Sequence, residues 1–217
     1  MAHWVLESVD EYVPDAKCLM DYHSKYPDFL NIIEEAEKFS HVISVCPEFP
    51  DQEGLLHNRT VTFDDDDLVN EKVHVFTAFE VLDRIFDPLG FIEKINKACE
   101  RGGLLFLTAN TISGFEYQML NGMSPRLHPP DRLNLLSIEA IQHRLTESGF
   151  EVIELSTPGR VDVQIVRDVL KDNPAIEIHD IFRYIFTNRD EKTWHSLQDF
   201  LQQNRLSSYV RVMAQKK

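Results

Sequence analysis

Polar side chains follow several apolar segments of the chain directly, which is where α/β proteins place groups that bind ligands. Asp21 and His23 follow the apolar run "CLM", Glu80 follows "VHVFTAF", and Asn110 closes "LLFLTAN". If these runs are parallel strands, their carboxyl ends lie along one edge of a sheet, where ligands bind at the switch point of strand order. Carboxylate and amide oxygens at that edge could accept hydrogen bonds from ligand hydroxyls.

The turn after the first of these runs contains no glycine. Residues 23–27 read "HSKYP", and Gly54 is the only glycine among the first 89 residues. Glycine turns let the backbone approach a nucleotide because glycine has no Cβ and adopts positive φ at little cost. Lys25, before the next helix, could instead hold a phosphate or carboxylate. The alternative is an exposed turn that binds no ligand.

Arg84 and Arg132 could have either of two roles. Arg84 and Arg132 could bind an anionic ligand, such as a sugar acid or a nucleotide sugar, through bidentate hydrogen bonds. They could equally pair with neighbouring acids, for which Asp83, Asp87 and Asp131 are the candidates. The sequence leaves both interpretations open.

Alternating strands and helices must position all these groups. Apolar runs predict strands over 17–22, 41–46, 59–63, 73–79, 104–110, 151–155 and 207–215. Amphipathic patterns predict helices over 3–13, 28–39, 88–103 and 137–150, and helical sequence with polar joints over 161–204. This alternation predicts an α/β fold with a mostly parallel sheet covered on both faces.

Composition limits the partners and the cellular compartment. The net charge of −14 repels phosphate backbones and anionic lipids, so we expect neither nucleic acid nor membrane as a partner. No apolar run is long enough to span a bilayer and no signal peptide is recognisable, which predicts a cytoplasmic protein. Cys18, Cys46 and Cys99 fit neither a disulfide framework nor a metal site, so they are expected to be reduced thiols.

The segment 76–118 resembles class I S-adenosylmethionine-dependent methyltransferases. In that family the fourth strand ends in a Glu-Val-Leu-Glu-His-like run, followed by a Pro-led helix, a Pro-Gly-Gly-like turn and a strand ending near Thr-Pro-Asn. This chain has "EVLDR" from Glu80, a helix from Pro88, "RGG" at 101–103 and "TAN" at 108–110. The later "HPPDRLNLLSIEA" is similar to methyltransferases of surface-polysaccharide and small-molecule biosynthesis, so the likeness extends over about 15–217.

The resemblance implies a Rossmann-like, seven-stranded, mostly parallel sheet whose last strand is antiparallel, with extra C-terminal helices. It divides one methyltransferase-like domain, 1–217, into an N-terminal helix (1–14), a Rossmann-like core (15–160), a helical insertion (161–204) and a closing strand (205–217). Ligands would lie at the carboxyl ends of the strands.

The resemblance also implies which positions would contact S-adenosylmethionine. They are Asp21, His23, Lys25, Cys46, Asp65, Asp66, Glu80 and Asn110. Cys46 stands where the family has the acid that accepts the ribose hydroxyls, although a thiol is a weak acceptor. Asp65 and Asp66 could supply the acid near adenine, or belong to a solvated loop.

Three positions that hold histidine in related enzymes are changed in this chain. They read Arg84, Arg132 and Tyr209, and arginine cannot act as a general base near neutral pH. We therefore hypothesise a degenerate, non-catalytic methyltransferase-like protein of polysaccharide or small-molecule biosynthesis, with a protein partner or a second copy of itself. The alternative is an active S-adenosylmethionine-dependent methyltransferase that acts on a sugar or small metabolite.

Overall fold

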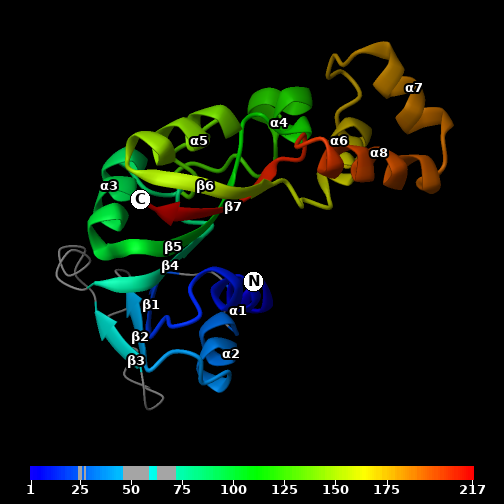
Figure 1. Ribbon diagram of the computed structural model, residues 1–217. Helices are drawn as coiled ribbons and strands as arrows, with labels where there is room; N and C mark the ends of the chain where they lie inside the picture. The colour runs from blue at the N-terminus through cyan, green and yellow to red at the C-terminus, as the bar shows by residue number, and fades with distance from the viewer. Residues whose placement is uncertain (24–25, 27, 46–58, 63–71) are drawn as a thin grey trace.

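A mixed β-sheet runs through the centre of the molecule (Figure 1). The structure, a computed structural model, describes residues 1–23, 26, 28–45, 59–62 and 72–217. Within these residues seven strands form the sheet in the order β3-β2-β1-β4-β5-β7-β6. The strands are β1 (Cys18–Tyr22), β2 (His41–Val45), β3 (Arg59–Thr62), β4 (Val73–Phe79), β5 (Cys99–Asn110), β6 (Phe150–Ser156) and β7 (Tyr209–Lys216).

The direction of the strands agrees with the sequence prediction. Strands β1 to β5 pair in parallel, whereas β7 pairs antiparallel with both β5 and β6. The predicted α/β class, the seven-stranded sheet and the reversed last strand are confirmed. Chain order reverses between β1 and β4, which places the switch point of the sheet at the carboxyl ends of those two strands.

Helices cover both faces of the sheet with apolar stripes. On one face, α1 (Ala2–Tyr12) and α2 (Phe29–Glu35) bury Val5, Val9 and Ile33 against the strands. On the other, α3 (Pro88–Ala98) and α5 (Ile138–Glu147) bury apolar residues such as Ile92 and Ile141. This arrangement buries the sheet on both sides, as the uniformly apolar strands require.

Two helix ends differ from the prediction. Helix α3 ends at Ala98 instead of 103, because Cys99 already pairs with Val73 of β4. Helix α2 ends at Glu35 instead of 39, and Glu37 just beyond it adopts a φ of 50°, which is incompatible with a continuing helix.

A separate helical group extends beyond the end of the sheet (Figure 1). It consists of α4 (Phe115–Leu120), the short 3₁₀ helix η2 (Asn121–Met123), α6 (Asp162–Asp172), α7 (Asp180–Asn188) and α8 (Glu191–Gln203). Leu120, Val163, Val166 and Leu201 form the core of this group. No helix that the structure describes is both long and apolar enough to cross a membrane.

Candidate functional site

The carboxyl ends of β1, β4 and β5 lie side by side and bring the predicted polar groups to one edge of the sheet. Asp21 is in register with Thr77, two residues before the end of β4, and Phe79 is in register with Thr108 near the end of β5. Asn110 is the last residue of β5. Of the predicted cofactor positions, Lys25, Cys46, Asp65 and Asp66 lie outside the described residues.

Asp21 is a buried structural acid in this arrangement. The residue is 1% exposed, and its Oδ1 accepts a hydrogen bond of 2.6 Å from the Thr77 hydroxyl. This bond joins neighbouring strands at their carboxyl ends. Asp21 therefore holds β1 against β4 beneath the edge of the sheet.

Two residues without glycine's freedom adopt positive φ at this edge. His23 has a φ of 50° just after β1, and Glu80 has a φ of 56° just after β4. The His23 amide donates to the Val45 carbonyl at 2.8 Å, and the Glu80 amide is 2.9 Å from the carbonyl and 3.0 Å from the hydroxyl of Thr108. Such conformations cost about 1 kcal/mol or more and concentrate at functional sites.

The Glu80 carboxylate is the centre of a network of side chains. Its Oε1 accepts from the Tyr26 hydroxyl at 3.1 Å, and its Oε2 accepts from Arg84 Nη1 at 3.3 Å and lies 3.8 Å from Arg132 Nη2. The hydroxyls of Tyr26 and Tyr209 are 2.9 Å apart. Burial, together with the contact with Tyr209, raises the pKa of Tyr26, so this phenol stays protonated at neutral pH. The predicted residues Glu80, Arg84, Arg132 and Tyr209 thus meet in one place.

Arg84 also pairs with Asp131, an acid that does not belong to a strand. Its Nε donates to Asp131 Oδ1 at 3.0 Å and its Nη2 to Asp131 Oδ2 at 3.3 Å, which is a bidentate pair. The same guanidinium also bonds to the Glu80 carbonyl through Nη1. Of the three acids considered for the arginines, Asp87 instead caps α3, where its Oδ1 accepts from the Gly90 amide at 3.0 Å.

Arg132 pairs with a deeply buried acid. Its Nη1 donates to Asp83 Oδ2, which also accepts from the Asn110 side-chain amide at 2.9 Å. The Asp83 side chain is 1% exposed, and Oδ1 has no hydrogen-bond partner among the described residues. Burial lowers the pKa of Arg132, although a guanidinium in this setting still remains charged. Both arginines therefore engage acids of the chain itself.

A buried acid that the sequence pattern did not indicate lies next to this network. Glu116 lies in α4 and is fully buried; its Oε1 accepts from the Ser124 hydroxyl at 2.5 Å and its Oε2 lies 3.5 Å from Arg126 Nη1. Arg126 Nη1 is also 3.5 Å from the Asn110 side-chain oxygen. The signal in the sequence was a lone glutamate between aromatics, "GFEY", in a segment for which we predicted no helix.

The pKa of Glu116 predicts a pH-dependent stability. Burial raises this pKa, so the folded chain binds the proton more tightly than the unfolded chain does. The contribution of Glu116 to stability is therefore largest below its unfolded pKa and is lost as the pH rises through its folded pKa. Glutamine imitates the protonated form of glutamate and does not titrate. The free energy of unfolding of Glu116→Gln, minus that of the wild type, should therefore increase as the pH rises.

Urea unfolding of both proteins, from about pH 4 to about pH 8, measures this difference across the titration range of glutamate. Glu151→Gln, an exposed substitution on β6, is the matched control and should show no such trend. A stability difference between Glu116→Gln and wild type that is constant with pH would disprove the raised pKa.

The described residues do not fit S-adenosylmethionine well. After β1 the chain presents His23, with a Cβ and a positive φ, where a backbone approach to the cofactor needs glycine. Tyr26 and Glu80, which face this edge, already bond to each other. A cofactor here would have to break or displace these contacts.

Comparisons with known proteins agree on the fold of the chain. A family model described as a methyltransferase domain matches residues 3–155, which include β1 to β5 and nearly all of β6. Among curated proteins, no sequence matches significantly.

Solved structures resemble the chain over nearly its whole length. An S-adenosylmethionine-dependent methyltransferase from Clostridium acetobutylicum has a TM-score of 0.60 at 9% identity, with 99% of this chain and 90% of that chain covered. A putative sarcosine dimethylglycine methyltransferase from Galdieria sulphuraria has a TM-score of 0.61 at 11% identity, covering 100% and 85%. The mycolic acid cyclopropane synthase CmaA1, solved with SAH and CTAB, has a TM-score of 0.55 at 13% identity, covering 98% and 84%.

Because these sequence identities are low, the similar structures establish the fold alone. The activity has to be argued from the residues of the site. The family match covers well over half of the chain and includes the strand edge at which Glu80, Asp83 and Asn110 meet. The chain belongs to the methyltransferase domain family.

Proposed function

We propose that this protein is a non-catalytic member of its family, which serves polysaccharide or small-molecule biosynthesis as a partner or regulatory subunit. The observation that carries the proposal is the closed network at the strand edge. Glu80 bonds to Tyr26 and Arg84, while Asp83 bonds to Arg132 and Asn110. Groups that bond to one another in this way are not presented to a ligand, and breaking them to admit one would cost binding energy.

The residues of the family motifs support the same proposal. The turn at 23–27 has no glycine, Cys46 replaces the ribose-binding acid, and three histidine positions of related enzymes read Arg84, Arg132 and Tyr209. A neutral thiol and two guanidiniums cannot take over the roles of an acid and a general base. We also propose that residues 1–217 form one cytoplasmic domain, in which 161–204 is a helical insertion.

An active S-adenosylmethionine-dependent methyltransferase acting on a sugar or small metabolite is the second candidate. The observation that favours it is the positive φ of His23 and Glu80, because strained backbone is retained most often at functional sites. When bound, S-adenosylmethionine supplies an electrophilic methyl group. The residues of this chain would then have only to align the acceptor with that methyl group.

Titration calorimetry of the intact chain with S-adenosylmethionine separates the two candidates. The non-catalytic proposal expects no saturable binding, because the groups at the strand edge are occupied by one another. Saturable binding at micromolar cofactor would favour the active methyltransferase, and a search for its acceptor among sugars and small metabolites would follow.

A further inference from the structure

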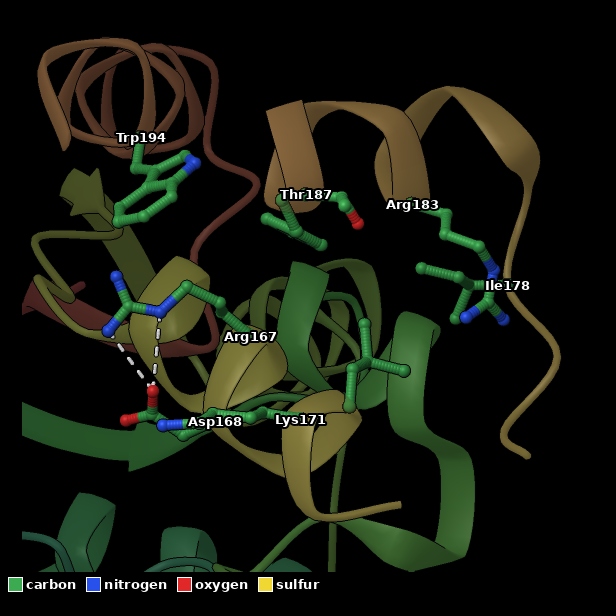
Figure 2. A pocket seen from close by; sticks show the side chains of 9 residues that line it. Arg167, Asp168, Lys171, Ile178, Arg183, Thr187 and Trp194 are labelled. Carbon is green, nitrogen blue, oxygen red and sulfur yellow. Dashed lines mark hydrogen bonds and ion pairs between the residues drawn. The ribbon is translucent and has the colours of Figure 1, made fainter. Parts of the chain in front are cut away.

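The C-terminal helical group encloses a cavity that lies away from the strand edge. It measures about 450 Å³ and is formed by residues of α6, α7, α8 and the segment between α6 and α7. Pockets of roughly 300–1,000 Å³ hold most small-molecule ligands. In Figure 2, Arg167, Asp168 and Lys171 extend from α6 in the lower part of the view, Trp194 lies at the upper left, and Arg183 lies at the right beside Ile178.

The charges that line this cavity are opposite to those of the whole chain. Three lining residues are basic, Arg167, Lys171 and Arg183, and one is acidic, Asp168. The chain as a whole has a net charge of −14. Among the described residues Lys171 and Arg183 have no ion-pair partner, and Arg183 Nη2 donates only to the Ile176 carbonyl at 2.7 Å. Two basic residues thus line the cavity without forming an ion pair with any described carboxylate.

An aromatic wall and an ordered guanidinium complete the lining. The Arg167 guanidinium lies 4.4 Å from the ring centroid of Trp194 and donates to Asp168 Oδ1 at 3.1 Å. The Trp194 indole is held in turn by a hydrogen bond of 3.2 Å to the Ile185 carbonyl. The indole ring and the guanidinium are both held in place by these contacts. A planar anionic ligand could therefore bind beside them with little loss of side-chain conformational entropy.

Helix α7 lines one side of the cavity and is only partly buried. None of its residues is buried, although Phe182 and Phe186 contact the neighbouring apolar cluster. When the apolar side of a helix is only partly buried, the helix either borders a binding site or docks against a partner. Lys171 on α6 and Arg183 on α7 itself both line the cavity without an ion pair among the described residues, which favours the binding site.

We propose that this cavity binds a small organic anion, in which a carboxylate or phosphate is attached to an aromatic or aliphatic body. The basic lining residues Lys171 and Arg183 attract the anionic group electrostatically, while Trp194 and Phe186 contact the apolar body. This site is independent of the strand edge, so it does not depend on whether S-adenosylmethionine binds.

A matched pair of fluorescent probes tests the proposal on the intact chain. 8-Anilinonaphthalene-1-sulfonate has an aromatic body with an anionic group, and N-phenyl-1-naphthylamine has the same body without the charge. We expect the anionic probe to bind saturably at one site, with the double substitution Lys171→Gln and Arg183→Gln weakening its binding by about tenfold. Binding of the neutral probe should not change.

Lys192→Gln is the control for a general loss of charge, because Lys192 is exposed on α8 and does not line the cavity. It should bind the anionic probe as the wild type does. The substituted residues are exposed, so melting temperatures should confirm that all variants fold. The proposal is wrong if the anionic probe shows no saturable one-site binding, or if the double variant and Lys192→Gln bind it equally well.

Discussion

Arg132→Gln should lower the free energy of unfolding by about 3 kcal/mol, because it removes one partner of a buried ion pair. Asp83 would remain almost fully buried with a negative charge, and its Oδ1 already lacks a hydrogen-bond partner among the described residues. Only the Asn110 side-chain and backbone amides, at 2.9 and 3.3 Å, would still donate to Oδ2. The decrease in the free energy of unfolding shows how much Arg132 contributes to the stability of the fold.

Chemical denaturation compares this variant with two controls. The double variant Asp83→Asn with Arg132→Gln should recover part of the loss, since it removes the uncompensated charge as well. Arg144→Gln breaks an exposed pair with Glu147 and should cost about 0.5 kcal/mol or less. If Arg132→Gln were as stable as Arg144→Gln, Arg132 would be a side chain available to a ligand, and the anion-binding interpretation of the arginines would gain support.

Asp162→Ala should have an effect of similar size, about 3–5 kcal/mol, because it leaves several buried donors without an acceptor. Asp162 is fully buried; it accepts from the Ser208 amide at 2.6 Å, the Ser207 hydroxyl at 2.5 Å and the Gln198 side chain at 3.2 Å. These bonds join α6 to α8 and to the segment that leads into β7. Their loss should loosen the helical group from the sheet.

The matched control for this prediction is Asp168→Ala on the same helix. Asp168 is half-exposed and pairs with Arg167 of the same helix beside the open cavity, so its removal should cost about 0.5 kcal/mol or less. Thermal unfolding followed by circular dichroism measures both variants. Equal melting temperatures for the two would show that Asp162 does not hold α6 in place.

The sheet could be predicted from sequence because its signals are local and repeated. Runs such as "VHVFTAF" and "LLFLTAN" are buried along nearly their whole length, so their apolar character specifies parallel strands without reference to any other part of the chain. Helix α4 was missed because it spans only Phe115–Leu120, which is too short for a helical period to be recognised.

The contacts within the site could not be predicted in the same way. Arg84 pairs with Asp131 and Arg132 with Asp83, each across more than forty positions of sequence, and the sequence offered several acids equally. Tyr26 was read as part of a polar turn, yet its hydroxyl reaches both Glu80 and Tyr209 from a distant strand end. Pairings of this kind depend on the tertiary fold, which brings the carboxyl ends of separate strands together.

The polar groups at the strand edge bond to each other instead of to a cofactor. Titration calorimetry of the intact chain with S-adenosylhomocysteine examines this closure, because this ligand lacks the transferable methyl group and reports binding alone. A closed network should give no saturable heat up to about 1 mM ligand, which corresponds to a binding free energy weaker than about −4 kcal/mol. A one-site isotherm with a Kd of about 1 μM, or about −8 kcal/mol, would show that the strand edge is open to the cofactor.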